Sequence, residues 1–452
     1  MFKKIEIWIL YLTILLSILF AVGFGVLVRQ ELVGGIKAGW VSKTALNLAE
    51  IPVKLKQAFI GLKVEDRFPN LDGFNGTPNS EESYLLLSRY DGDLKEGVVE
   101  LVDLRTFEIL HTWNPDIDAF NSLVKKLENP EFKNIQRDAN NSRHIIRHPK
   151  LSKNGNLFWV YGGPLHGIDA CSNLVFQNTH NHFHHSIEFN IDNDMWVPSH
   201  ISPYTLETLR VGNRFLEDGI TKLSLSDEIL FEKSIIQIFI ENGLEYLLFS
   251  VGDSHSAGAA NFDTDPIHIN DIQPVNFDGE FWKKGDVFLS MRHQSMVMLY
   301  RPSTNEIIWK GTGPFFHQHD IDILDSQRIS IFNNNSKDFV NADVVDGHNE
   351  VIIYDFKANE YSSYFKDSLI ENEVKTITQG RSEILTNGDL FIEESNYGRT
   401  LYFNSDGSLR WTHVNRAKNG GVYAVGWSRI LFTEEDFKTV NNFLTSKGTC
   451  NE

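Results

Sequence analysis

Cysteine is almost absent from this chain, which has two among its 452 residues, Cys171 and Cys450. Two distant cysteines provide neither a framework of several disulfides nor the four ligands of a cysteine-rich zinc site. Whether a single bridge joins them is left open by the sequence.

Positive charge is also in short supply. The chain has 42 Lys and Arg against 60 Asp and Glu, which gives a formal net charge of -18. No basic field is therefore present to neutralise nucleic-acid phosphates, and we expect no nucleic-acid partner. A small anion is a different case, because it responds to the charge of its own pocket and not to the net charge of the protein.

Several enzyme signatures are missing. The sequence contains no Gly-rich phosphate loop, no GxSxG elbow and no HExxH motif. This argues against nucleotide-dependent transfer, an α/β-hydrolase and a zinc protease of that type. We expect no cofactor.

One long apolar run stands at the N-terminus. About 22 residues from Ile7 to Val28 carry no charge, and a helix of that length is roughly 33 Å long, enough to span a membrane. A cleaved signal peptide has a shorter apolar region and a small-residue cleavage site, so we expect a retained anchor. Lys3 and Lys4 before the run, against Arg29 close behind it, predict a cytoplasmic N-terminus with the bulk of the chain outside.

The next segment is amphipathic. Apolar residues recur at helical spacing over residues 41–62, which indicates a packed stalk helix or, alternatively, a helix lying on the membrane surface. Residues 68–80 are rich in turn formers and suggest a domain boundary. We therefore predict an anchor over residues 1–30, a stalk and linker over 31–80, and one large domain over 81–452.

The large domain reads as strands in repeated units. One unit ends in a turn and an aromatic strand (105–113, 303–310, 404–411), and another joins two strands by a polar turn (151–163, 189–199, 276–290, 385–395). Units recur about every 40 to 60 residues, which is typical of a β-propeller with four strands in each blade. We expect an all-β, six-bladed β-propeller with helices decorating it at 117–127 and 434–445. Residues 251–265 read as a loop on the functional face.

Histidine and arginine are concentrated at strand starts. His268, Arg292 with His293, and His317 with His319 follow one another within 53 residues. An earlier tract, HNHFHH at 180–185, reads as a polar loop or a metal-binding tract and ends on His185.

In a propeller the innermost strands line a central channel, so residues from several blades can converge on its axis. We expect His185, His268, Arg292 and His319 to do so. Three of these are histidines and could bind zinc, but the permanent charge of Arg292 would repel a cation. An anionic ligand and no metal are therefore favoured.

These motifs resemble the bacterial arylsulfotransferase family, the periplasmic type that needs no nucleotide sulfate donor. The matching pieces cover roughly residues 150–411: HHSIEF, HINDIQPV, DVFLSMRHQSMVMLY followed by TNEIIWKGTG, QHDIDIL and QGRSEILTNGDLF. The resemblance implies a six-bladed propeller and a ping-pong reaction. In that reaction a histidine takes the sulfuryl group from an aryl sulfate and passes it to a phenol.

Carried over by motif, His319 of QHD would be the nucleophile, and His185, His268 and Arg292 would bind the sulfuryl oxygens. We predict His317 and Arg381 as further substrate-binding residues, and His317 also competes with His319 for the nucleophile role. The resemblance further implies a catalytic domain in the periplasm that acts on a small aryl sulfate donor and a phenolic acceptor. Together with the N-terminal anchor, this predicts a single-pass protein of the bacterial inner membrane. The oligomeric state is left open.

The family pattern has an aspartate where this chain has Ser186. That departure, together with the anchor, supports an alternative: a non-catalytic propeller that binds an anionic glycan or lipid at the cell envelope. A third hypothesis is a metal-dependent hydrolase built on the histidines.

Overall fold

The computed structural model describes residues 6–33, 38–49, 51–52, 62–124, 135–160, 162–206, 215–249, 265–339, 342–448 and 450. By their contacts, the residues fall into two compact units. One comprises Met1–Gly61, Thr208–Phe215 and Leu247–Thr264, and the other Leu62–Glu207, Leu216–Tyr246 and Asp265–Glu452.

The first unit contains two helices. The first, α1 (Ile7–Val33), confirms the predicted apolar helix, and its span Ile7–Glu31 has a mean hydropathy of 2.5. Against it packs α2 (Trp40–Ala49), whose Ser42 Oγ donates a hydrogen bond of 2.8 Å to Glu31 Oε2. The predicted stalk helix thus begins as expected, while residues 53–61 lie outside the described part of the chain.

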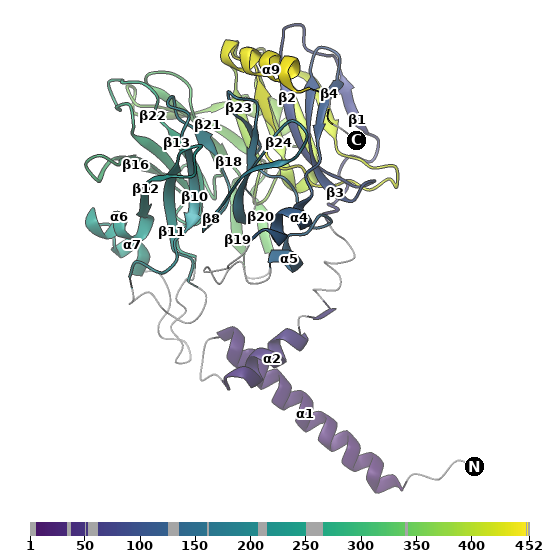
Figure 1. The fold of residues 1–452 in the computed structure, drawn as a ribbon. Coiled ribbons are helices and arrows are strands. Elements are labelled where there is room, and N and C mark those ends of the chain that lie inside the picture. The colour runs from purple at the N-terminus through teal and green to yellow at the C-terminus, as the bar shows by residue number, and fades with distance from the viewer. Residues whose placement is uncertain are drawn as a thin grey trace. The chain divides into compact units, whose positions relative to one another are not determined.

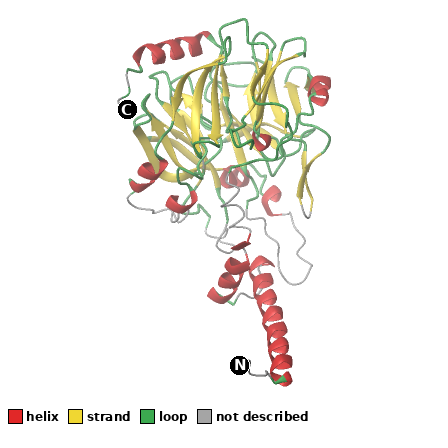
Figure 2. Cartoon of the chain, turned by 90° about the vertical axis from the view of Figure 1, so that its right-hand side faces the viewer, coloured by secondary structure: helices red, strands yellow, loops and turns green. Residues whose placement is uncertain are grey.

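The second unit is a propeller-like arrangement of antiparallel sheets (Figure 1, Figure 2). One four-stranded sheet has the order β27 (Arg429–Leu431), β2 (Tyr84–Asp91), β3 (Glu96–Asp103), β4 (Glu108–Trp113). A second has the order β13 (Ile269–Pro274), β14 (Val287–Met291), β15 (Met296–Arg301), β16 (Glu306–Thr312). A third has the order β17 (Asp320–Ile323), β18 (Arg328–Asn333), β21 (Glu350–Asp355), β22 (Glu360–Tyr364).

Two larger sheets and a hairpin complete the described strands. The five-stranded sheet has the order β1 (Gly73–Gly76), β26 (Leu409–Val414), β25 (Arg399–Phe403), β24 (Leu390–Glu394), β23 (Arg381–Ile384). The eight-stranded sheet has the order β12 (Ile229–Ser234), β11 (Asp218–Leu223), β10 (Met195–His200), β8 (Leu174–Phe183), β7 (Gly163–Ile168), β6 (Leu157–Trp159), β5 (Lys150–Leu151), with β9 (Glu188–Phe189) beside β10. The hairpin is β19 (Ser336–Phe339) with β20 (Ala342–Val345).

Burial along the strands explains why the sequence pattern predicted sheets. The interior strand β14 is buried at every position, whereas β16 at a sheet edge alternates between exposed and more buried residues. That alternation is the two-residue period of a strand with one face in solvent. The recurrent polar turns are strand connections, and Gly155 and Gly388 adopt φ values of 85° and 87° that favour glycine there.

Strands from the first and last parts of this unit pair with one another. Strand β27, near the C-terminus, pairs with β2, and β1, from the N-terminal side, pairs with β26 of the last sheet. Figure 1 shows the last, yellow part of the chain lying beside the first, blue strands. Residues 62–80, which the sequence assigns to a linker, therefore include a strand of the second unit.

Buried carboxylates tie neighbouring sheets together. Asp218 Oδ2 accepts a hydrogen bond of 2.9 Å from the Ile269 backbone N–H, and Asp271 Oδ2 accepts one of 3.1 Å from that of Ile321. Asp320 Oδ2 likewise accepts one of 3.1 Å from the Ser382 N–H. Each link joins the backbone of one sheet to a side chain of the preceding one.

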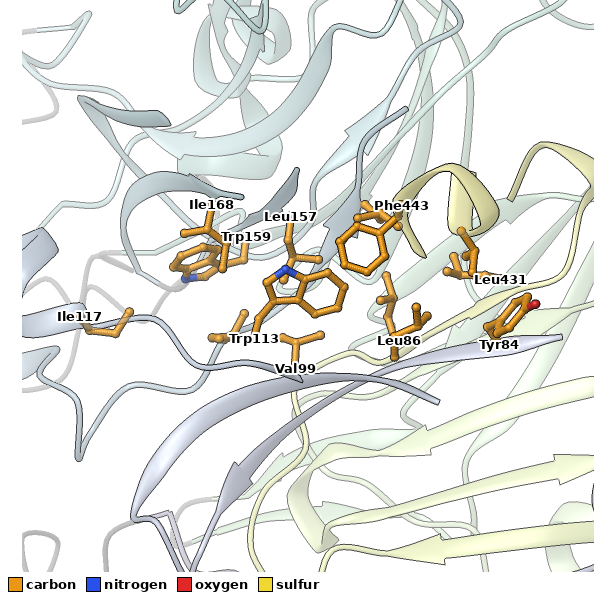
Figure 3. Packing of buried hydrophobic residues seen from close by; sticks show 14 of the residues in the cluster. Tyr84, Leu86, Val99, Trp113, Ile117, Leu157, Trp159, Ile168, Leu431 and Phe443 are labelled. Carbon is orange, nitrogen blue, oxygen red and sulfur yellow. The ribbon is translucent and has the colours of Figure 1, made fainter. Parts of the chain in front are cut away.

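The C-terminal helix packs against the hydrophobic cluster that contains Trp113. Helix α9 (Glu434–Ser446) confirms the predicted C-terminal helix and begins with a capping box of Thr433 and Asp436. The ring centroid of Phe443 in this helix lies 4.9 Å from that of Trp113 (Figure 3). A disulfide joins Cys450 to Cys171, closing the question that the sequence left open.

The remaining helices are short. The predicted helix over 117–127 is α4 (Ile117–Ser122), and residues 125–127 lie outside the described part. Five further short elements were not predicted: α5 (Ile135–Asp138), α6 (Ile235–Glu241), α7 (Tyr246–Phe249), α8 (Lys366–Glu371) and the 3-10 turn Ser395–Tyr397.

Candidate active site

Four histidines occupy left-handed backbone positions just before the start of a strand. His148 precedes β5, His185 precedes β9, His268 precedes β13 and His317 precedes β17, with φ between 49° and 59°. Positive φ is uncommon outside glycine and costs energy, and such positions gather at functional sites. A left-handed turn at each of these positions interrupts the two-residue alternation of a strand, so that alternation does not decide which histidines share a face.

The structure brings together the four residues that the sequence selected: His185, His268, Arg292 and His319, which we call the imidazole cluster. His185 Nε2 lies 3.3 Å from His268 Nε2, and the His185 and His319 ring centroids are 6.0 Å apart. The backbone N–H of Arg292 donates a hydrogen bond of 3.0 Å to the His268 carbonyl oxygen. Loops flanking four different strands thus converge on one place.

Asp265 holds His268 in position. Its Oδ2 accepts a hydrogen bond of 2.6 Å from His268 Nδ1, which directs the other ring nitrogen toward His185. Burial raises the pKa of Asp265, but the hydrogen bond and positive charge of His268 outweigh it and bring the pKa to about 2. The sequence placed Asp265 at the end of a loop without assigning it a role, and residues 250–264 of that loop lie outside the described part.

Arg292 is held by its neighbour in sequence. Its side chain is buried, and its Nη1 donates a hydrogen bond of 2.9 Å to His293 Nε2. His293 Nδ1 in turn donates one of 2.5 Å to the Asp265 carbonyl oxygen. His293, part of the dense basic stretch in the sequence, therefore orients the guanidinium.

Asn334 fixes the tautomer of His319. The His319 side chain is buried, and its Nδ1 lies 2.8 Å from Asn334 Oδ1. The Asn334 amide nitrogen donates to the carbonyl oxygens of Thr376 at 3.0 Å and Gln379 at 2.8 Å, so its oxygen must face the imidazole. His319 Nδ1 therefore carries the proton, and Nε2 presents a lone pair.

The other nitrogen of His319 is kept reactive by its surroundings. Among the described residues no group hydrogen-bonds to the buried Nε2. Burial, and then the positive charge of Arg292, hold the pKa of His319 well below its ordinary range. The imidazole is therefore neutral near pH 7, and a neutral nitrogen with a free lone pair is a nucleophile.

His317 and Arg381 have different surroundings. The His317 carbonyl oxygen lies 3.3 Å from His319 Nδ1, and its ring lies 6.1 Å from that of His293, centroid to centroid. Arg381 is buried, with its Nη2 3.3 Å from Glu383 Oε2 and its Nε 3.8 Å from Asp320 Oδ2. A substrate-binding role for either residue stays a prediction.

Four acids form a group that we call the carboxylate cluster, Asp271, Asp320, Asp322 and Glu383, and Arg381 interacts with the last three. Burial raises the pKa of Asp271 and of Asp320 to about 7, and raises the pKa of Asp322 and Glu383 as well. Asp320 directly follows His319 in the chain, yet it faces this cluster and links two sheets.

Ser186, the departure from the family pattern, has a structural partner. Its Oγ accepts a hydrogen bond of 3.1 Å from the backbone N–H of Ile272. The hydroxyl thus makes the same kind of link between neighbouring sheets as the aspartates described above. Its presence therefore does not by itself favour a non-catalytic protein.

Comparison with protein families identifies the chain. The model for "Arylsulfotransferase (ASST)" matches residues 151–416, more than half of the sequence and the part that contains the imidazole cluster. The chain belongs to the arylsulfotransferase family. This confirms the resemblance seen in the motifs and assigns the protein as an aryl sulfotransferase enzyme with small-molecule donor and acceptor substrates.

The other comparisons add little information about this arylsulfotransferase. No curated protein matches it. Solved structures that resemble it include a protein of unknown function from Bacteroides caccae (12% identity, 76% of this chain and 98% of that chain covered, TM-score 0.45). The Neurospora crassa Pan2 WD40 domain (8%, 80% and 91%, 0.41) and a streptogramin B lyase (10%, 80% and 97%, 0.36) are others. At such low TM-scores none of these likenesses carries an argument.

Proposed function

We propose that the enzyme transfers a sulfuryl group from an aryl sulfate to a phenol in two half-reactions, through a sulfated His319. The observation that carries the proposal is the buried Nε2 of His319, which has a lone pair and no hydrogen-bond partner among the described residues. A nucleophile so prepared divides one difficult transfer into two easier steps.

In the first half-reaction the Nε2 lone pair attacks sulfur. A bond forms between nitrogen and sulfur, the bond between sulfur and the aryl oxygen breaks, and its electron pair leaves with the phenolate. His268 Nε2 supplies a proton to the departing oxygen. The imidazole of His319 becomes positively charged, and Asn334 Oδ1 stabilises that charge through the Nδ1 proton.

In the second half-reaction the oxygen of the acceptor phenol attacks the same sulfur. Its proton passes to His268, whose Nδ1 stays hydrogen-bonded to Asp265. The nitrogen–sulfur bond breaks, and its electron pair returns to His319 Nε2. The enzyme regains its starting state, and the product is a new aryl sulfate.

The other members of the imidazole cluster bind the sulfuryl oxygens. Arg292 supplies a fixed positive charge and the imidazole of His185 an N–H donor, and the Nε2–H of His268 donates to the sulfuryl group before its proton moves to the departing oxygen. Preorganised donors of this kind stabilise the charge that develops on oxygen in the transition state. Arg381 and His317 take part as secondary substrate-binding residues in this proposal.

Six blades are part of the same proposal. Six residues with positive φ stand one to three positions before a strand at one end of a sheet or half-sheet: His148, His185, His268, His317, Gly380 and Trp427. Counting the eight-stranded sheet as two blades makes one such position for each blade. The four histidines are therefore equivalent positions on successive blades, which explains how two of them meet His319.

We also propose that α1 is an uncleaved anchor that holds the enzyme on the periplasmic side of a bacterial inner membrane. The domain limits would be 1–30, 31–80 and 81–452, with β1 from the second of these segments pairing with β26 of the last. The Lys3 and Lys4 pair favours a cytoplasmic N-terminus. The disulfide between Cys171 and Cys450 supports an oxidising compartment for the large domain.

A burst experiment tests the two-step mechanism. The full chain in detergent is mixed with excess nitrophenyl sulfate and no acceptor, and released nitrophenolate is followed by its absorbance. We expect a burst of one equivalent per chain, followed by turnover only when a phenol is added. Direct transfer would be indicated instead by the absence of a burst together with steady turnover in the presence of both substrates.

A further inference from the structure

A second group of histidines lies outside the imidazole cluster. His184 stands between β8 and β9, His200 ends β10, and Asp218 begins β11. The Nε2 atoms of His184 and His200 lie 3.2 and 3.4 Å from Asp218 Oδ1, and the three atoms lie within 4.8 Å of one another. The side chain of Asp218 is buried, and those of His184 and His200 are 10% and 14% exposed.

The hydrogen bond by which Asp218 links two sheets does not explain why two imidazoles face its carboxylate. Asp218 Oδ2 makes that link to Ile269, but Oδ1 faces two imidazoles instead. Asp271 and Asp320 make equivalent links, and no histidine in the described ranges pairs with either of those carboxylates. The two imidazoles are therefore an addition to the structural role of Asp218.

Ordinary hydrogen bonds do not account for it either. Asp218 Oδ1 and His184 Nε2 are both buried and have no hydrogen-bond partner within the described part of the chain. The two N···O distances of 3.2 and 3.4 Å lie at and beyond the long end of the ordinary range of about 2.7–3.2 Å. Asp265 and His268, by contrast, make a short hydrogen bond of 2.6 Å, so the second possible group of ligands, Asp265 with His268 and His293, is satisfied by hydrogen bonding.

The spacing agrees with ligands around a metal ion. Zinc binds imidazole nitrogen and carboxylate oxygen at about 2.0–2.1 Å in tetrahedral geometry, which places neighbouring ligand atoms about 3.3 Å apart. We propose that His184, His200 and Asp218 bind a divalent first-row metal ion, with zinc the ion that this ligand set and geometry fit. Two imidazoles and one carboxylate without thiolate are a ligand set of that class.

The position of this site gives it a role beside the active site. His184 is adjacent in sequence to His185, and Asp218 Oδ2 holds the backbone of Ile269, the residue that follows His268. A bound ion would fix the two turns that present His185 and His268. The metal site itself does not depend on the proposed sulfuryl transfer, and it differs from the expectation of no metal drawn from the sequence.

Metal content of the purified full chain tests the proposal. The protein is purified in detergent, incubated with one zinc equivalent, desalted and measured by mass spectrometry of the elements. We expect about one zinc per chain for the wild type, and less than about one tenth for His200→Ala. His182→Ala is the matched control, because His182 stacks on His200 with ring centroids 5.1 Å apart but is not among the three ligands; it should keep its zinc.

Folding is controlled in the same series. Circular dichroism verifies that each variant is folded. His200→Cys, which replaces one zinc ligand by another, should restore zinc binding. Cobalt replacing zinc should give the visible absorption of a tetrahedral site in the wild type and in His182→Ala, but not in His200→Ala. The proposal is overturned if the folded wild type retains no zinc, or if folded His200→Ala binds as much zinc as the wild type.

Discussion

The imidazole cluster and the carboxylate cluster adjoin in the chain at His319 and Asp320, yet they have opposite chemistry. His319 and Asp320 are consecutive residues; the first presents a lone pair, and the second accepts a backbone N–H and links two sheets. Burial acts on both, and in both it favours the neutral form of the side chain. It makes a nucleophile of the imidazole and a structural hydrogen-bonding group of the carboxyl.

The comparison shows that neighbouring residues of one motif need not share a role. A motif such as QHD combines a residue for chemistry with a residue for the scaffold. Substitutions at the two should therefore have separable effects, one on turnover and one on stability.

The largest effect is expected for His319→Ala. Removal of the nucleophile should lower turnover with nitrophenyl sulfate and a phenol by at least about 10³-fold. The melting temperature should fall only modestly, because the substitution removes the hydrogen bond between His319 Nδ1 and Asn334 Oδ1, whereas Nε2 has no partner to lose among the described residues. His317→Ala is the control, and we expect it to keep most of the activity; a larger loss there than in His319→Ala would exchange the two assignments.

Arg292→Met should lower kcat by about 10²–10³-fold, because it removes a fixed charge from the developing sulfuryl oxygens. Arg301→Met is a matched control. Arg301 Nε donates a hydrogen bond of 2.8 Å to Asp286 Oδ1, so its loss should reduce stability but not turnover. Steady-state kinetics and melting curves of both variants test this, and equal kinetic losses would remove Arg292 from the site.

Asn334→Asp should change the pH dependence of the first half-reaction. A carboxylate beside Nδ1 favours the imidazolium, so the pKa of His319 should rise from its depressed position. The acid limb of the burst rate should therefore move to higher pH, with a smaller change in rate at pH 9. An unchanged acid limb would show that Asn334 does not act through the His319 imidazole.

The smallest expected effect is on stability. Asp271 and Asp320 have pKa values of about 7, above their ordinary value of 3.8. Their protonated forms stabilise the fold fully below the unfolded pKa, and this contribution is lost as pH rises through about 7. For one such group the free energy of unfolding should fall by about 1 kcal/mol between pH 6 and 8. Melting curves should show this fall, and Asp320→Asn should flatten it; a slope as steep as that of the wild type would contradict the assignment for Asp320.

Sequence periodicity predicted the strands, the first and last helices and the repeated polar turns, because these depend on local patterns of burial. It also selected His185, His268, Arg292 and His319, which the fold brings together. The pairing of β27 with β2 and of β1 with β26 could not be read from the sequence, since it depends on contacts between distant segments.

The supporting residues of the site were also beyond prediction. Asp265 and Asn334 act through single hydrogen bonds that depend on where loops end, and three consecutive asparagines at 333–335 gave no means of choosing one. The left-handed turns at His185 and His268 were missed for a related reason. Histidine has no strong preference that would mark such a turn, as glycine has.

Peptide mass spectrometry of the enzyme after reaction with an aryl sulfate alone tests the central claim most directly. Digestion and sequencing under conditions that preserve the nitrogen–sulfur bond should place the mass of one sulfuryl group on His319. The same treatment of His319→Ala should leave every peptide unmodified. A sulfuryl group found on another residue of the wild type, or none found while the enzyme turns over with both substrates, would contradict the account.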